Sequence, residues 1–165
     1  PITTHIKLKK VTSSLSKKKI EDKLVTINKF YLNNFKIKPK IGILGLNPHN
    51  DELRKSSEEK KIIIPVIKKL RIMKISAFGP LSPDTAFLNF RTKGFNILIG
   101  MYHDQVLSPF KALFKFNAIN ITLGLPFIRI SPDHGTGKDI IRKNLADPTS
   151  LLEAINFFKN KNVKT

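Results

Sequence analysis

The sequence contains neither cysteine nor tryptophan among its 165 residues. Without cysteine, the chain can form neither a disulfide framework nor a thiolate zinc site. No apolar run approaches the roughly 18 consecutive residues that a membrane-spanning helix needs. These absences predict a cytoplasmic protein with no membrane partner.

Acidic residues are scarce, since 12 Asp and Glu stand against 30 Lys and Arg, for a net charge of +18. Such an excess usually raises nucleic acid as a partner. Most of these cations, however, are lysines spread along the chain, and no basic run alternates with aromatic residues. A lysine- and isoleucine-rich background explains the charge equally well. We therefore expect no nucleic-acid partner, and a basic nucleic-acid-binding module stays the alternative from another class.

The chain also lacks an initiator methionine. It opens on Pro1, and the run Ile2-Thr3-Thr4-His5 is typical of the end of a strand. We therefore expect a fragment whose N-terminal part is missing.

Strand and helix patterns alternate along the sequence, which predicts an α/β fold with a mixed, mainly parallel sheet. Strands are expected over residues 40–46, 75–78, 95–101, 118–123 and 126–130. Helices are expected from a cap at Ser13 or Ser14 to the break at Lys38-Pro39, after Ser56, after Ser82, around Lys111, over 136–143, and after Asp147-Pro148 with Leu151, Leu152, Ile155 and Phe158 on its apolar face.

Three local signals refine this pattern. Ser56 and Glu59 have the spacing of a capping box. Pro65 lies inside a helical pattern and predicts a kink or a boundary. Gly79-Pro80-Leu81 predicts a turn.

Polar residues follow the apolar run 95–101 abruptly, as Tyr102-His103-Asp104-Gln105. In open α/β sheets, ligands bind outside the carboxyl ends of the strands, so this position suits chemistry. The next segments carry Lys111, Asn120 and Arg129. Such a set indicates a site for an anionic, metal-bound small molecule. The alternative is a group of unrelated polar residues at loop ends.

Three of the four histidines share one context. His5, His49 and His103 each follow an expected strand. Loops after parallel strands converge on one edge, and three imidazoles with an open position can hold zinc or a similar ion. Unrelated surface or capping histidines remain an alternative, because no local pair of ligands exists.

Six motifs, in order along the chain, carry a family resemblance. They are T-T-H-I (3–6), G-L-N-P-H (45–49), G-P-L-S-P-D-T (79–85), M-Y-H-D-Q (101–105), N-I-T-L-G-L-P-F-I-R (120–129) and D-H-G-T (133–136). Together they resemble the C-terminal half of the 4-hydroxythreonine-4-phosphate dehydrogenase family, NAD-dependent enzymes of pyridoxal 5′-phosphate biosynthesis. One departure is the run 50–55, N-D-E-L-R-K, where the family usually carries a glycine-rich loop.

The resemblance implies an isocitrate/isopropylmalate dehydrogenase-like fold of two domains, working as a homodimer with the active site at the subunit interface. Residues 1–134 would bind metal and substrate, and residues 135–165 would return to a cofactor domain whose N-terminal part is absent. It also implies NAD or NADP and a divalent metal, Zn, Mg or Co, as cofactors. We expect the isolated chain to be inactive.

The resemblance further assigns roles to individual residues. It implies His5, His49 and His103 as metal ligands, Lys111, Asn120 and Arg129 as substrate-binding residues, Lys111, Asp104 and Asp84 as catalytic residues, and His134, Gly135 and Thr136 as cofactor-binding residues.

The implied reaction oxidises and decarboxylates 4-phosphooxy-L-threonine. The alternative within the enzyme class is a related metal-dependent β-decarboxylating dehydrogenase that acts on another phosphorylated hydroxy acid.

Overall fold

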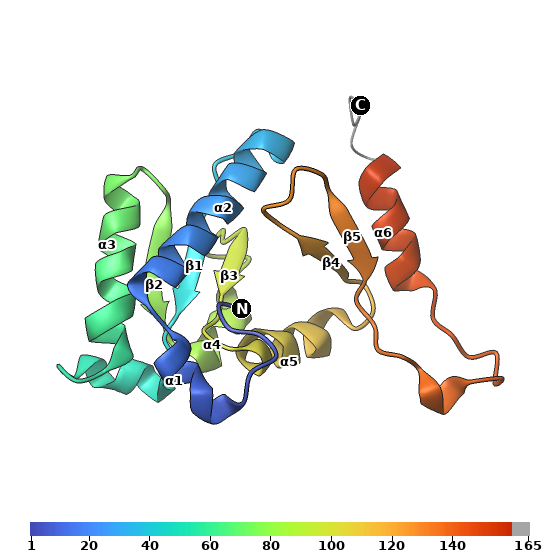
Figure 1. Cartoon of the computed structure of the whole chain (residues 1–165), viewed down its shortest axis with the longest axis horizontal. Coiled ribbons are helices and arrows are strands. Elements are labelled where there is room, and N and C mark those ends of the chain that lie inside the picture. Colours follow the sequence, from blue (N-terminus) through green and yellow to red (C-terminus); the bar gives the residue numbers. More distant parts are fainter. Residues whose placement is uncertain (160–165) are drawn as a thin grey trace. The chain divides into compact units, whose positions relative to one another are not determined.

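A computed structural model describes residues 1–159 and shows an α/β protein (Figure 1). The chain forms two compact units, residues 1–109 and residues 110 onward. This division does not coincide with the expected functional boundary at residue 134. That boundary concerns which residues bind metal, substrate and cofactor, and it stays a prediction.

The first unit is built on a parallel sheet with strand order β2-β1-β3. Its strands are β1 (Ile41–Leu44), β2 (Ala77–Leu81) and β3 (Ile97–Ile99). Every residue of the central strand β1 is buried, as expected for a parallel strand covered on both faces. The predicted mainly parallel α/β sheet is therefore confirmed.

Helices surround this sheet. They are α1 (Val11–Ser14), α2 (Lys17–Phe35), α3 (Ile64–Ile72) and α4 (Pro83–Asn89), together with short 3-10 segments at Leu8–Lys10 and Pro48–Leu53 and a π-helical turn at Glu59–Ile63. The amphipathic pattern of α2 buries Ile20 and Leu24 completely. These side chains join Ile41, Ile43 and Leu70 in one core.

Two predicted helix caps are wrong. The N-cap of α2 is Ser16, whose hydroxyl accepts a hydrogen bond from the Lys19 N–H at 3.2 Å. Ser13 and Ser14 are already used by the short helix α1. At the next helix, the Lys60 N–H donates to Ser57 at 3.2 Å, whereas the Glu59 carboxylate turns toward the end of β1.

Of the two predictions made from prolines, the one at Pro65 is confirmed and the one at Pro80 is wrong. Pro65 does mark a boundary, because the π-helical turn ends at Ile63 and α3 begins at Ile64, where a missing N–H costs little. The turn predicted at Gly79-Pro80-Leu81 is wrong, since these residues extend β2. Gly79 has a φ of 141°, and a Cβ there would lie 2.3 Å from the Ile43 carbonyl oxygen, so glycine is needed where β2 passes β1.

The second unit contains an antiparallel pair of strands. Helix α5 (His103–Phe114) leads from the first unit into β4 (Ile119–Thr122) and β5 (Arg129–Pro132), followed by a 3-10 turn at Lys138–Ile140 and helix α6 (Thr149–Lys159). The antiparallel strands thus form a sheet of their own. Strand β5 begins at Arg129, later than the expected start at residue 126. Where the sequence predicts a helix over 136–143, the structure has only the 3-10 turn.

Helix α6 packs on β4 and β5 (Figure 1). Ser150 is fully buried there, donating to the Ala118 carbonyl at 2.5 Å and accepting from the Asp133 N–H at 2.7 Å. The predicted helix is confirmed, but Leu151, Leu152, Ile155 and Phe158 are 42–52% exposed. Within the described residues, no helix is both long and apolar enough to cross a membrane.

Candidate active site at the carboxyl ends of the parallel strands

Two of the candidate metal ligands meet at the end of β3. The ring centroids of His5 and His103 lie 5.8 Å apart. Backbone hydrogen bonds explain the approach, because the Ile2 N–H donates to Gly100 O at 2.8 Å and the Thr3 N–H donates to Met101 O at 3.1 Å. The N-terminal segment therefore follows β3 and brings its histidine beside the next one.

The third histidine has a different neighbour. His49 follows β1, and its Nε2 lies 3.9 Å from the Asp84 carboxylate at the start of α4. Within the part of the chain that the structure describes, no group of three His, Cys, Asp or Glu residues is arranged to hold a metal. The structure thus pairs His5 with His103 and His49 with Asp84, and the three-histidine centre stays a prediction.

Asp104 lies against the imidazole of the preceding residue. Its Oδ1 is 2.7 Å from Nδ1 of His103. A carboxylate on one ring nitrogen selects the tautomer and leaves the other nitrogen available, which is a common arrangement around metal-binding histidines. Asp84 and Asp104, both implied as catalytic residues, each lie beside a candidate metal ligand.

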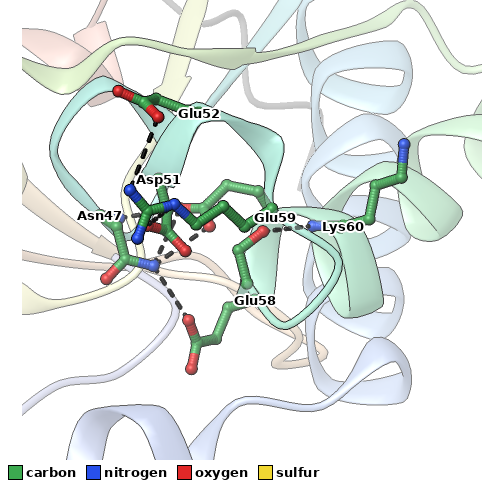
Figure 2. Close-up of polar contacts among 8 residues, drawn as sticks. Asn47, Asp51, Glu52, Glu58, Glu59 and Lys60 are labelled. Atoms are coloured by element: carbon green, nitrogen blue, oxygen red, sulfur yellow. Dashed lines mark hydrogen bonds and ion pairs between the residues drawn. The ribbon is translucent and has the colours of Figure 1, made fainter.

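The segment after β1 is held by one buried carboxylate, Glu59 (Figure 2). Its Oε1 accepts the N–H groups of Leu46 at 2.7 Å and Asn47 at 2.8 Å, and its Oε2 accepts the Asn47 amide at 3.1 Å. Burial acts to raise the pKa of Glu59, but these hydrogen bonds outweigh burial and lower that pKa. The charged form therefore holds the turn that leads to His49.

The loop that replaces the implied glycine-rich segment adopts an unusual backbone. Residues 49–53 all have positive φ, between 46° and 58°. Arg54 lies 3.8 Å from Asp51 and 3.6 Å from Glu52, so the loop carries its own ion pairs. Glycine adopts such a conformation without steric cost, and strained non-glycine residues cluster at functional sites. In this loop, residues other than glycine therefore adopt the positive-φ conformation that a glycine-rich loop would adopt easily.

Gln105 is a functional candidate that the sequence did not identify. Its Oε1 accepts the Met101 N–H at 2.6 Å, and its Nε2 donates to the Gly45 carbonyl at 2.7 Å. The side chain therefore joins the carboxyl ends of β1 and β3. In the sequence, Gln105 is marked only by its place two positions after His103, in the polar run that follows β3.

The predicted substrate residues fall into two places in the second unit. Asn120 and Arg129 are exposed on the β4–β5 pair, where cross-strand register places Asn120 opposite Ser131 and Thr122 opposite Arg129. Directly opposed residues share a face, and residues two apart along a strand do too. Asn120 and Arg129 therefore lie on one face, and the guanidinium donates to the Thr122 hydroxyl at 2.9 Å.

Lys111 is engaged within the same unit. Its ammonium lies 2.7 Å from the Asp133 carboxylate and also donates to the Asp133 carbonyl oxygen. Asp133 thus orients Lys111, a contact that the sequence did not reveal because 22 positions separate the two residues.

The predicted cofactor residues lie on an open segment. His134, Gly135 and Thr136 are all exposed, and His134 Nδ1 lies 3.0 Å from the Gly135 carbonyl. A Cβ added at Gly135 would meet no atom within 4 Å in the structure. The backbone there is open to a ligand, and the cofactor assignment stays a prediction.

A parallel sheet with imidazoles and carboxylates at its carboxyl edge is typical of α/β enzymes that bind small molecules at strand ends. The more specific assignment comes from comparison with known proteins. A family model described as "Pyridoxal phosphate biosynthetic protein PdxA" matches residues 1–158. The chain therefore belongs to this family.

Similar proteins carry one recurrent description, 4-hydroxythreonine-4-phosphate dehydrogenase. The Sulfurihydrogenibium sp. (strain YO3AOP1) protein is 55% identical over 156 residues, 93% of this chain and 48% of that protein. The Aquifex aeolicus protein is 44% identical over 160 residues, 96% of this chain and 49% of that protein. The chain thus spans about half the length of the curated relatives it matches.

Solved structures agree with this relationship. A crystal structure of the Klebsiella pneumoniae enzyme of that description has a TM-score of 0.81 and 35% identity, covering 94% of this chain and 47% of that protein. A terephthalate 1,2-cis-dihydrodioldehydrogenase from Burkholderia xenovorans LB400 is also similar, with a TM-score of 0.71 and 28% identity, covering 93% of this chain and 49% of that protein.

Proposed function

We propose that this chain is the C-terminal half of an NAD- or NADP-dependent 4-hydroxythreonine-4-phosphate dehydrogenase. The observation that carries the proposal is the family match over residues 1–158, together with the adjacent His5 and His103 beside Asp104. In the proposed enzyme, residues 1–134 bind metal and substrate, and residues 135–165 belong to the cofactor domain. In this proposal each subunit has two domains of the isocitrate/isopropylmalate dehydrogenase type, and two subunits form a homodimer with the active site at their interface.

The donor chemistry at the carboxyl edge fits a divalent metal in part. His5 and His103 are close enough to ligate one ion, and Asp104 occupies the other ring nitrogen of His103. Within the described residues His49 forms no three-ligand group with these two, so the proposed site takes its third imidazole across the dimer interface. A divalent metal such as Zn, Mg or Co, when bound there, supplies Lewis acidity toward the reacting hydroxyl and carbonyl.

The second unit supplies the groups for a phosphorylated substrate. Arg129 offers a planar fork suited to phosphate or carboxylate, and Lys111 offers a compact charge that Asp133 orients. Asn120, on the same face as Arg129, adds an amide that can donate and accept hydrogen bonds. Together they suit a small molecule that carries both an anion and hydroxyl groups.

The proposed reaction is an oxidation followed by decarboxylation. The 3-hydroxyl of 4-phosphooxy-L-threonine loses its proton, and the carbon-bound hydrogen leaves as hydride to the nicotinamide of NAD+. The resulting β-keto acid then loses CO2, and a proton replaces the carboxylate. Lys111 is the proposed residue for moving the proton, while Asp104 and Asp84 hold the imidazoles of His103 and His49. His134, Gly135 and Thr136 are the proposed contacts for the dinucleotide.

Turnover by the full-length parent protein tests this proposal. The assay follows NAD+ reduction with 4-phosphooxy-L-threonine and added divalent metal. We expect steady NADH formation that EDTA abolishes. Turnover of a different phosphorylated hydroxy acid, but not this one, would favour the related β-decarboxylating dehydrogenase instead.

A second candidate function follows from the similarity to the terephthalate 1,2-cis-dihydrodioldehydrogenase. The same family fold can therefore carry an oxidation of a non-phosphorylated hydroxyl compound. Assaying a cis-dihydrodiol and 4-phosphooxy-L-threonine side by side separates the two candidate functions. The cis-dihydrodiol carries no phosphate for Lys111 and Arg129 to bind.

Arg129→Lys should weaken substrate binding although the charge is retained. A lysine cannot reproduce two parallel hydrogen bonds to an anion, so KM should rise about 10- to 100-fold, the equivalent of about 1.5–3 kcal/mol. Steady-state kinetics of the full-length enzyme measure this. Arg142→Lys is the matched control, because Arg142 is exposed and lies outside the proposed site. An unchanged KM in Arg129→Lys would remove Arg129 from the site.

A further inference from the structure

A continuous set of side-chain hydrogen bonds links the three segments that carry His5, His49 and His103. Thr3 Oγ1 donates to the Met101 carbonyl at 2.7 Å, and the Met101 N–H donates to Gln105 Oε1 at 2.6 Å. Gln105 Nε2 then donates to the Gly45 carbonyl at 2.7 Å. All three bonds are buried, and they join positions that are 98 and 60 residues apart in the sequence.

Each member of this network lies a fixed, short distance along the chain from a histidine. Thr3 lies two residues before His5, and Met101 and Gln105 lie two residues before and after His103. Gly45 lies four residues before His49. The network therefore holds the backbone of the segments that lead to His5, His49 and His103.

The local packing shows that Gln105 is closely fitted. A Cβ added at Gly100 would lie 3.0 Å from Gln105 Oε1 and 2.5 Å from a methyl carbon of Val106. The absence of a side chain at Gly100 thus lets the first turn of α5 fold back onto the end of β3. The Met101 N–H and the Gly45 carbonyl lie beyond the paired strand residues, and Gln105 supplies the hydrogen-bond partner of each. Buried backbone groups need such partners.

We propose that Thr3 and Gln105 are positioning residues that set the geometry of the histidine site. This inference rests on the proposed metal-dependent function and deepens it. Neither side chain is proposed to touch the metal. Each bonds the backbone of Met101, two residues before His103, whose ring centroid lies 5.8 Å from that of His5. Partners one step removed from metal ligands commonly change metal affinity when they are lost.

The opposite ends of the same strands offer a comparison, with an exposed hydrogen bond in place of the buried ones. Asn96 lies just before β3, and Lys40 lies just before β1. The side-chain oxygen of Asn96 accepts a hydrogen bond from the Lys40 N–H at 2.8 Å. This amide therefore also joins β1 to β3, but at the amino edge, away from the histidines. Removing it tests the effect of a lost strand-linking amide without disturbing the site.

The experiment titrates the full-length metal-free protein with Co²⁺, whose visible absorption reports its coordination. Gln105→Met removes both hydrogen bonds at similar volume, and Thr3→Val replaces a buried hydroxyl with a methyl group. We expect the Co²⁺ dissociation constant to rise about 10-fold or more for Gln105→Met, with an altered visible band. Thr3→Val should shift it in the same direction by less. Asn96→Leu should leave the dissociation constant unchanged.

The outcomes separate this inference from the proposed function. If the unsubstituted protein binds no Co²⁺, the proposed metal site and this inference both fail. If the unsubstituted protein binds Co²⁺, and the Gln105→Met and Thr3→Val variants fold and bind Co²⁺ equally tightly, only the inference fails. An equal loss in Asn96→Leu would also overturn it, since affinity would then follow general stability. Should Gln105→Met not fold, Thr3→Val decides.

Discussion

Glu59→Ala is expected to lower the free energy of unfolding by about 3 kcal/mol at pH 7, because it removes a fully buried carboxylate and leaves two part-buried N–H groups without their acceptor. Those groups belong to Leu46 and Asn47, which follow β1 directly. Truncation would also leave a cavity beneath the turn to His49. Urea unfolding of the full-length protein, followed by circular dichroism, measures the difference.

The pH dependence of this loss identifies its cause. The hydrogen bonds lower the pKa of Glu59 in the folded state below its usual value of 4.5, despite burial, which acts to raise it. A depressed carboxyl pKa contributes stability that is fully present above the unfolded pKa and is lost as pH falls through the folded pKa. The gap between the parent protein and Glu59→Ala should therefore be constant near neutrality and narrow below about pH 4.5.

Glu58→Ala provides the control for this prediction. Glu58 accepts the same Asn47 amide at 2.9 Å, but it is only partly buried. Its loss should cost less than about 1 kcal/mol, because water can replace it. Equal destabilisation by the two variants would mean that the buried carboxylate does not organise this turn.

His103→Ala should lower the divalent-metal affinity of the full-length enzyme by more than about 100-fold, beyond the 10- to 100-fold typical of a partner one step removed from the metal. The imidazole is a proposed ligand and lies beside His5. kcat/KM at limiting metal should fall in parallel. Metal titration by competition with a chromophoric chelator gives the affinity directly.

Two further variants are expected to affect the divalent-metal affinity less than His103→Ala does. Asp104→Asn keeps the ligand but removes the carboxylate that lies 2.7 Å from the His103 ring, so its loss of affinity should be about 10- to 100-fold. His134→Ala removes a histidine that is proposed to bind the cofactor, and its metal affinity should be unchanged. A His103→Ala enzyme that retains full metal affinity would contradict the assignment of this residue.

The sequence pattern was most informative where local rules decide the structure. The apolar run at 40–46 became the buried strand β1, and the periodic apolar residues of α2 formed its buried face. Proline at position 65 marked a boundary because its missing N–H excludes it from a helix interior. The position of histidines after strands was also readable, since strand ends are defined by a change in polarity.

Side-chain partners were less predictable because distant segments supply them. Ser56 and Glu59 have the spacing of a capping box, yet Glu59 binds two N–H groups 12 and 13 positions away. Leaving these two part-buried N–H groups without an acceptor would cost more than losing a surface cap that water can replace. Likewise, Lys111 contacts Asp133, which lies 22 positions further along the chain.

By itself, the sequence determined the α/β class, the places of the strands and most helices, and the motifs that mark the family, because periodicity, proline and motif order are local properties of the chain. Only the tertiary structure decided that His5 meets His103 while His49 lies beside Asp84. It also decided that Gln105 links the ends of β1 and β3. These pairings depend on strand order and register, which bring residues as far apart as Thr3 and Met101 into contact and which no local pattern encodes.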